Sequence, residues 1–416
     1  MSTPSFTVER LAWDDEILGE VPTPRGRLVL RSSFGSGLAR RRSDPQGRVW
    51  AIGDRGPNLK VKDAVKLYGL DHLAPLRSQS GAKIMPRPDL GPAIAELQVA
   101  GDRIELIRTL RLTGKDGVPV SGLPVPDTGH DRTEPVFDLD GHPLPADGGG
   151  LDTEGIAALA DGGFWVGDEF GPSLVRLDAE GRILVRLVPE GVRLDAAYPV
   201  EARLPAIAAR RQLNRGFEAL TLSEDGQWLF LAFQSPLAHP DEAAHEAAAH
   251  VRLWRLDAES GAVLAEYLYP LDPPESFARD VAKDEKFNKS DIKVSEIVCA
   301  GADTLLVLER GSETTKIYRA RLSAACELPP EHLDLATRPS VEEHSGAGGA
   351  FPLPVLPKQS LFTTDDAPQI SPDLEGMVIL SPHELLLVND NDFGVEGAET
   401  SFWRVTFEEP VLGDGA

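Results

Sequence analysis

Cysteine, long apolar runs and targeting signals are scarce or missing in this chain of 416 residues. Cys299 and Cys326 are its only cysteines, which are too few for a disulfide framework, and the apolar run around Cys299 predicts a buried thiol. No apolar run approaches the roughly 18 residues of a membrane span, and the first residues lack a basic region followed by an apolar one. As written, the chain is therefore expected to be cytoplasmic and to stay out of membranes.

Positive charge is also in short supply. Lysine and arginine total 42 against 66 aspartates and glutamates, which leaves a net charge of −24. Such a surface repels the phosphates of nucleic acids and of anionic membranes, so neither is expected as a partner. The acidity fits bound cations that neutralise part of it, and it fits high solubility equally well.

Several catalytic motifs are absent from the sequence. It has no Gly-x-Ser-x-Gly elbow, no P-loop and no dinucleotide fingerprint. Its nine histidines fall outside the repeated segments described next, apart from His383, which stands in a turn. The chemistry that fits what remains is metal-assisted hydrolysis with a bound water as nucleophile.

Short strands and turns are abundant instead, with 39 glycines and 34 prolines spread along the chain. Five segments share one pattern, in which a strand-like run meets a turn signal and a second strand rich in Trp, Val, Leu and Phe. This pattern is the signature of a β-hairpin. The five segments are residues 37–55, 154–169, 218–234, 296–310 and 375–390.

Copies of one sheet unit at long intervals are typical of an all-β fold, the β-propeller, in which each innermost strand lines a central channel. The repeats predict a single propeller domain over residues 1–416, with five or six four-stranded blades and long insertion loops. A sixth blade would be divided between residues 60–150 and residues 190–215.

Other stretches are assigned by exclusion. Residues 113–150 and 239–250 do not follow the repeat and are predicted to be the long insertion loops. Closing a propeller ring usually brings the two ends of the chain into one blade. We therefore expect residues 6–13 to complete the blade of residues 402–407.

Four of the hairpins begin with a glutamate: Glu154, Glu218, Glu296 and Glu375. Corresponding ends of the inner strands of a propeller converge at one mouth of the channel. We therefore expect these four carboxylates to lie together, although each could instead end its strand separately in solvent.

Clustered carboxylates cannot all stay ionised unless a cation compensates them or they share protons. With no His or Cys nearby, oxygen ligands favour Ca2+, with Mg2+ also possible. Residues 389–394 partly resemble a calcium loop but lack the spacing of an EF-hand. The predicted metal ligands are Asp54, Glu154, Asp168, Glu218, Glu296, Glu375, Asn389, Asp390 and Asp392.

Basic residues accompany these acids. Arg55 and Arg310 each follow a carboxylate directly, and Arg215 stands three residues before a glutamate. An arginine so placed could bind the oxygens of a phosphate or carboxylate, or it could be the ion-pair partner of the neighbouring acid. We predict Arg55 and Arg310 as contacts to an anionic substrate, and Glu169 or Glu309 as the general base.

Several motifs resemble those of the phytase-like family, whose members are described as having the esterase-like activity of phytase. They are Asp-Thr-Glu-Gly (152–155), Gly-Asp-Glu-Phe-Gly-Pro (167–172), Asn-Arg-Gly-Phe-Glu-Ala-Leu (214–220), Leu-Glu-Arg (308–310), Leu-Glu-Gly-Met (374–377) and Asn-Asp-Asn-Asp-Phe (389–393). The resemblance extends over nearly the whole chain. It implies a β-propeller, phosphoester hydrolysis with calcium, and export from the cell.

The residues and the resemblance together predict a calcium-dependent hydrolase of phosphoric or carboxylic esters, which acts as a monomer on a small anionic substrate. Two alternatives stay open: a non-catalytic propeller that binds a partner and uses calcium as a structural ion, and a calcium-dependent lactonase. A metal with open coordination positions would favour an enzyme, whereas full coordination by the protein would favour the structural ion.

Overall fold

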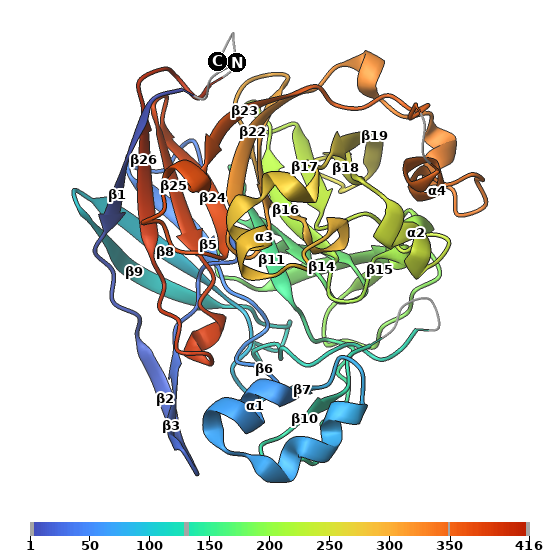
Figure 1. Ribbon diagram of the computed structural model, residues 1–416. Coiled ribbons are helices and arrows are strands. Elements are labelled where there is room, and N and C mark those ends of the chain that lie inside the picture. Colours follow the sequence, from blue (N-terminus) through green and yellow to red (C-terminus); the bar gives the residue numbers. More distant parts are fainter. Residues whose placement is uncertain (1–3, 129–132, 348–349, 413–416) are drawn as a thin grey trace.

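The computed structural model describes residues 4–128, 133–347 and 350–412. Five sheets stand around a central axis (Figure 1). The first blade has strands β4 (Gly37–Ala39), β5 (Arg48–Ile52), β8 (Ala93–Ala100) and β9 (Arg103–Arg111). The second has β11 (Thr153–Ala158), β12 (Phe164–Asp168), β13 (Ser173–Leu177) and β14 (Ile183–Pro189), with β15 (Val200–Leu204) added in parallel at its outer edge.

The other three blades each have four antiparallel strands. The third blade has β16 (Phe217–Leu222), β17 (Trp228–Phe233), β18 (His250–Asp257) and β19 (Val263–Pro270). The fourth has β20 (Lys293–Cys299), β21 (Thr304–Arg310), β22 (Thr315–Arg321) and β23 (Lys358–Thr363). The fifth has β24 (Leu374–Ser381), β25 (Glu384–Asn389), β26 (Phe402–Phe407) and β1 (Phe6–Leu11).

The innermost strands close a ring in the order β4, β11, β16, β20 and β24, and β24 contacts β4 again. The described residues therefore form a five-bladed propeller. The stretches considered for a sixth blade have other places, because residues 190–215 supply β15 and residues 60–150 supply outer strands of the first blade. Ring closure is confirmed: β1 pairs with β26 from Phe6 opposite Phe407 to Leu11 opposite Phe402.

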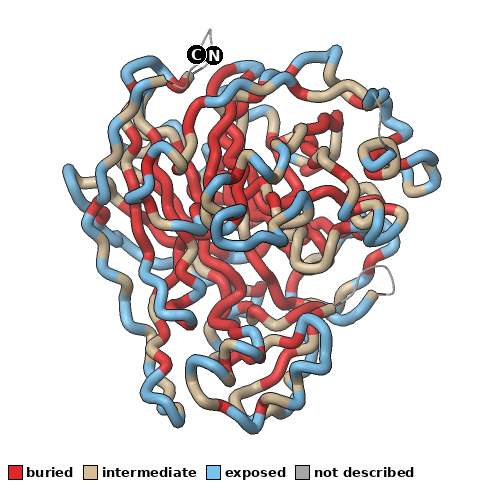
Figure 2. The backbone as a smooth tube through the Cα atoms, in the orientation of Figure 1, coloured by how far each residue is buried: buried red, intermediate tan, exposed pale blue. Residues whose placement is uncertain are grey.

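The core lies between the blades, where side chains from alternate strand positions pack against the next sheet. Figure 2 shows this burial concentrated in the blade strands. Between the second and third blades, for example, Trp165 and Trp254 are almost fully buried. Phe233 meets Phe217 and Trp254 edge-on, with ring centroids 5.0 and 5.1 Å apart. This packing fixes the inner strands, and with them the channel.

One end of the channel is partly covered by inserted segments. Strands β6 (Leu59–Lys60), β7 (Lys83–Ile84) and β10 (Val136–Phe137) form a small sheet beside helix α1 (Val61–Tyr68), and we call this unit the cap (Figure 1). The hairpin of β2 (Ile17–Thr23) and β3 (Gly26–Arg31) lies next to it. The predicted loop 113–150 thus contributes a cap strand.

Helices are short and lie outside the blades. The predicted loop 239–250 contains helix α2, which begins at an Asp241 cap, and its last residue opens β18. No helix in the described ranges is long and apolar enough to cross a membrane. Besides α1, the helices are α2 (Glu242–Ala247), α3 (Ala278–Lys283), α4 (Val341–Gly346), and the 3₁₀ segments η1 (Asp71–Ser78), η2 (Ala206–Arg210), η3 (Pro274–Ser276), η4 (Lys289–Asp291), η5 (Ala324–Cys326), η6 (Pro330–Leu333), η7 (Thr364–Asp366) and η8 (Asp392–Gly394).

Candidate metal centre at one mouth of the channel

Four of the inner strands, β11, β16, β20 and β24, have a β-bulge near their first residues. In β11, β16 and β24 the register shifts at Glu154, Glu218 and Glu375. A β-bulge of this kind leaves a residue out of the ladder and changes the direction of its side chain. The three glutamates therefore stand at one level of the ring, at the mouth that the cap partly covers.

The fourth blade carries the same bulge with different residues. The register of β20 shifts at Ser295, and Glu296 follows it. The prediction that Glu296 is equivalent to the other three glutamates is therefore wrong by one residue. Glu296 Oε2 accepts from Leu38 N of the first blade at 3.0 Å, and its Oε1 accepts from Ile297 N at 3.1 Å. This fully buried side chain links blades inside the channel instead of facing the mouth.

Two groups of three carboxylates meet at the mouth and share Asp54. Asp54, Asp152 and Glu154 each offer an oxygen within 4.8 Å of the others, and Asp54, Asp390 and Asp392 do the same. Asp54 and Asp152 are buried, whereas Asp392 is exposed. Oxygen-only sets of this kind suit Ca2+ or Mg2+. The first group is thus enclosed by protein, and the second opens toward solvent.

Unsatisfied oxygens support a cation in the enclosed group. Both carboxylate oxygens of Asp152 are buried and have no hydrogen-bond partner in the described residues, although Arg55 Nη2 lies 2.9 Å from Oδ2. Oε2 of Glu218 is buried without a partner as well. Buried acceptors are normally satisfied, and a bound ion is one explanation when they are not.

The electrostatics point the same way. Burial, with Asp152 beside it, raises the pKa of Asp54 well above its ordinary value, and burial with Glu218 beside it does so for Glu154. Burial and then Asp152 raise the pKa of Glu169 to about 8. Without a cation these acids can keep their charge only at a high cost, so they hold protons instead.

Arg55 and Arg310 are ion-pair partners of the acids. Arg55 Nη1 lies 2.5 Å from Glu134 Oε2, and its Nη2 donates to Asn214 Oδ1 at 2.6 Å. Arg310 bonds to Glu375, and its Nη1 lies 3.2 Å from Asp373 Oδ1. Of the two roles left open by the sequence, the geometry favours the ion pair, because both guanidinium groups are already engaged.

The sequence model of phytase-like proteins, described as "Esterase-like activity of phytase", matches residues 33–393. The chain belongs to this family. A curated relative, an uncharacterized secreted protein of Arthroderma benhamiae, is 33% identical over 242 residues, which are 49% of this chain and 44% of the relative. The matched part is thus less than half of that relative's length.

Two solved structures resemble the chain at low similarity. A luciferin-regenerating enzyme is 10% identical, with 99% of each chain covered and a TM-score of 0.38. A protein of Agrobacterium tumefaciens titled as the calcium-binding protein regucalcin is 10% identical, with 97% of this chain and 98% of that chain covered and a TM-score of 0.35.

Other predicted site residues of this phytase-like chain form hydrogen bonds that stabilise the fold around the site. Asp168 accepts from Arg186 Nη2 at 2.7 Å, from Ser173 Oγ at 2.5 Å and from the Asp152 backbone N at 2.7 Å. Phe170 N is a fourth donor, at 3.3 Å, so the geometry favours a framework role for this carboxylate over the predicted role as a metal ligand. The bond from the Asp152 backbone also fixes the position of Asp152.

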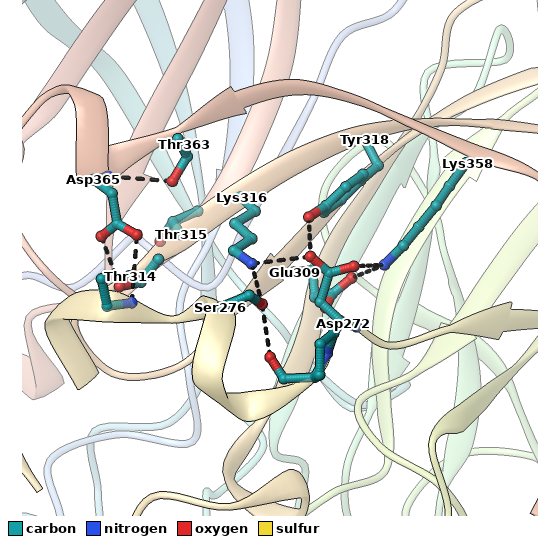
Figure 3. A network of polar contacts seen from close by, with 12 residues as sticks. Asp272, Ser276, Glu309, Thr314, Thr315, Lys316, Tyr318, Lys358, Thr363 and Asp365 are labelled. Carbon is teal, nitrogen blue, oxygen red and sulfur yellow. Dashed lines mark hydrogen bonds and ion pairs between the residues drawn. The ribbon is translucent and has the colours of Figure 1, made fainter. Parts of the chain in front are cut away.

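Asn389 and Glu309 are also corrected. Asn389 Oδ1 accepts from Ser401 N at 2.7 Å, so the amide braces the loop instead of binding a metal. Glu309 accepts from Tyr269 Oη and Lys358 Nζ at 2.7 Å, and from the backbone N of Asp272 at 2.6 Å. Figure 3 shows Glu309 beside Lys358 and Asp272. All its bonds belong to this separate network, so Glu309 is not available as a general base at the mouth.

Asp152 is the functional candidate that sequence reasoning missed. It stands inside the Asp-Thr-Glu-Gly motif, but it precedes β11 and lies outside the hairpin pattern that selected the other acids. Its proximity to Glu154 and its place within a family motif were the available signals. Glu169, which is buried and accepts from Gly216 N at 3.3 Å, stays a predicted base.

Proposed function

We propose that this chain is a divalent-cation-dependent hydrolase of ester bonds, with the cation held at the mouth by Asp54 and its carboxylate neighbours. The observation that carries the proposal is the sharing of Asp54 between two groups of three carboxylates, each group with oxygens within 4.8 Å. Membership of the phytase-like family supports the same chemistry. Calcium is the preferred cation of such oxygen sets when they are irregular, and magnesium is the second choice.

Each residue of the site has one of three roles: holding the cation, accepting a proton or positioning the carboxylates. Asp54, Asp152 and Glu154 would hold a cation in the enclosed group, and Asp54, Asp390 and Asp392 in the open one. A divalent cation supplies Lewis acidity and an activated water in such a site. Glu169 is the candidate to take the proton of that water, because its buried carboxyl group lies beside Asp152 of the enclosed group. Arg55 and Arg310 position the carboxylates.

A non-catalytic propeller with a structural cation is the second candidate. It is favoured by the enclosed group, since Asp54 and Asp152 are buried and a closed coordination shell is typical of structural ions. The open group favours the enzyme, because the exposed Asp392 leaves room for water or substrate. No contact in the described residues favours the lactonase.

The proposal extends to partners and location. We expect a small anionic ester as the substrate, a monomeric enzyme, and neither nucleic acid nor membrane as a partner. The secreted relative supports the export that the family resemblance implies over a cytoplasmic location.

The test is hydrolysis of p-nitrophenyl phosphate and p-nitrophenyl acetate by protein loaded with Ca2+, loaded with Mg2+, or treated with EDTA. We expect cation-dependent cleavage of at least one ester. A folded protein that binds the cation by calorimetry but cleaves neither ester would establish the binding module. Cleavage of lactones alone, in the same assay series, would establish the lactonase.

A further inference from the structure

The channel has a second mouth, on the side opposite the candidate metal centre, and a cavity of about 640 Å³ lies there. All five blades contribute to its walls through the later residues of their inner strands, whereas the metal centre stands at the first residues of these strands. Among the described residues, none of the carboxylates of the metal centre lines this cavity. The structure thus holds a second cavity that the proposed hydrolysis does not use.

Apolar side chains form most of the walls. They include Ile156, Ala158, Leu220, Leu222 and Ile379. Leu222 and Ile379 keep part of their surface exposed, so apolar area borders the cavity itself. Cavities of roughly 300–1,000 Å³ with apolar walls and a few polar groups are typical of sites for small molecules. The size and the walls therefore suit the apolar body of a small ligand.

Arg40 brings an unused pair of donors to this cavity. Its Nη1 donates to the backbone oxygens of Ile379 at 2.9 Å and Leu380 at 2.8 Å, and these bonds fix the guanidinium group at the wall. Its Nε is buried without a hydrogen-bond partner, and its Nη2 forms no hydrogen bond or ion pair within the described ranges. Buried donors are normally satisfied, so the free edge of this guanidinium group calls for an explanation.

The acid that attracts Arg40 is already engaged by other donors. This acid is Asp44, whose Oδ1 accepts from Arg41 Nη1 at 3.2 Å and whose Oδ2 accepts from Trp50 Nε1 at 2.7 Å. Burial outweighs the attraction of Asp44 and lowers the pKa of Arg40. A second anion beside Arg40 would therefore offset a charge that the protein itself compensates only in part.

The rim of the cavity carries more positive than negative charge. Residues 40–42 are the one run of three consecutive basic residues in the sequence, and all three line the cavity. The acids that line it are Glu224 and Asp225, in the exposed turn between β16 and β17, where water screens their charge. In a chain with a net charge of −24, this mouth is therefore a place that favours an anion.

The free donors specify the anionic group. Nε and Nη2 of an arginine form one edge of its planar fork, and that edge matches the two oxygens of a carboxylate. The apolar walls specify the rest of the ligand, because a fully polar anion would leave them without an apolar partner. An uncharged apolar molecule would leave the two donors unsatisfied. A molecule with both an apolar body and a carboxylate uses the whole cavity.

We propose that this mouth is a binding site for a small amphiphilic carboxylate, such as a medium-chain fatty acid. The carboxylate binds to the Nε and Nη2 edge of Arg40, and the hydrocarbon chain packs against the apolar walls. This site uses no metal ion and none of the residues proposed for hydrolysis, so it stands or fails independently of the proposed function.

The first experiment measures binding of octanoate and of 1-octanol to EDTA-treated protein by calorimetry. The two probes share their chain length and differ in the carboxylate, so octanoate should bind at least about tenfold more tightly through its charge-assisted hydrogen bonds. Equal affinities would overturn the contact with Arg40. Octanoate binding that appears only after calcium loading would place the ligand at the metal centre and would overturn the site.

Two variants test the two parts of the site. Arg40→Gln should weaken octanoate binding by about tenfold or more and change 1-octanol binding by less than about twofold. Ala160→Trp, at an exposed position on the wall, should fill the cavity and weaken binding of both probes by about tenfold or more, with a melting temperature near that of wild type.

Their matched controls are Arg42→Gln at the exposed rim and Ala262→Trp in an exposed turn outside the cavity. Both controls should keep octanoate affinity within about threefold of wild type. Wild-type octanoate affinity in folded Ala160→Trp would overturn the site, whatever the stability of Arg40→Gln.

The second experiment uses the thiol of Cys299, which lines the cavity and is partly exposed. Octanoate at about ten times its Kd leaves about one site in eleven empty, so alkylation of Cys299 by iodoacetamide should slow by roughly tenfold. Cys326 lies outside the cavity and is the internal control, because its alkylation rate should not change. Peptide mass spectrometry measures both rates. An unchanged Cys299 rate in protein that binds octanoate would place the ligand elsewhere and overturn the site.

Discussion

The two mouths of the channel are built from the same five strands but carry different chemistry. At the cap side, the bulged strand starts bring Glu154, Glu218 and Glu375 beside the carboxylates around Asp54. At the opposite side, the other ends of these strands line a cavity of about 640 Å³ whose walls are mostly small and apolar, with Arg40, Arg41 and Arg42 among its lining residues.

The channel narrows between its two mouths, and we call the level of Gly37, Gly155 and Glu296 the waist. A Cβ added to Gly37 would lie 2.5 Å from the Glu154 carbonyl oxygen, and one added to Gly155 would lie 2.7 Å from that of Glu218. Only glycine allows the strands to approach so closely. Glu296 fills the channel at this level. The comparison teaches that the carboxylates concentrate at the mouth where β11, β16, β20 and β24 each carry a bulge near their first residues, and each prediction below tests this difference between the mouths.

The largest effect is expected for Asp54→Asn, because Asp54 belongs to both carboxylate groups. The amide keeps the shape but removes a charge that a cation requires. Since changes next to metal ligands already cost 10–100-fold, we expect kcat/KM to fall by about 100-fold or more, together with the affinity for Ca2+. Ester hydrolysis and calcium calorimetry provide the measurements.

Asp225→Asn, at the opposite mouth, is the matched control for this change. Asp225 is exposed, so the variant should keep activity within about twofold of wild type. Equal losses in the two variants would show that the mouths are not functionally distinct.

Removal of the cation comes next. A ligand that binds only the folded state at 100 times its Kd stabilises it by about 2.7 kcal/mol, so EDTA should lower the melting temperature of metal-loaded protein by several degrees. An unchanged melting curve, in protein shown to contain metal beforehand, would contradict the site.

The metal-free protein should also respond to pH. Folded-state pKa values of about 8 for Glu169 and about 7 for Asp390 arise first from burial and then from neighbouring carboxylates. A raised carboxyl pKa contributes stability that is complete below the unfolded value of about 4 and is lost as pH rises through the folded value. Stability should therefore fall between about pH 4 and pH 8, and added Ca2+ should remove the decline. Denaturant titrations across this range measure both effects.

The sequence predicted the blades and the convergence, but not the detailed register. Strand alternation and turn signals locate a hairpin, and the ring topology then brings Glu154, Glu218 and Glu375 together. A bulge depends on how two strands pair in three dimensions, so the one-residue offset that separates Ser295 from Glu296 has no local signal. Side-chain partners from distant blades are equally invisible in a hairpin pattern. For that reason Glu309, which Lys358 engages, was misassigned.

Replacement of Glu296 should lower stability without changing calcium binding, because Glu296 belongs to the waist and not to the mouth. Its two oxygens accept from Leu38 N and Ile297 N, and Glu296→Gln retains only one acceptor. The unsatisfied backbone donor should cost about 1–3 kcal/mol of unfolding free energy. Calcium affinity and activity per folded molecule should stay at the wild-type level, as measured by calorimetry and ester hydrolysis.

Glu154→Gln is the comparison variant and should show the reverse profile. It lies in a candidate metal group, so the lost charge should lower calcium affinity while stability of the metal-free protein changes little or rises. Loss of calcium binding in Glu296→Gln at full stability would return that residue to the metal site and contradict the assignment of Glu296 to the waist.

The smallest effect is expected for Arg42→Gln at the opposite mouth. Arg42 is exposed, and its Nη1 makes one contact, to the backbone oxygen of Glu224 at 3.3 Å. Surface changes of this kind usually alter stability by less than about 0.5 kcal/mol, and none of the proposed steps uses this residue. The variant should therefore match wild type in melting temperature, calcium affinity and hydrolysis of both esters. A tenfold loss of activity here, with the fold intact, would mean that substrate or product also engages the arginines of the opposite mouth, and the functional division between the two mouths would fail.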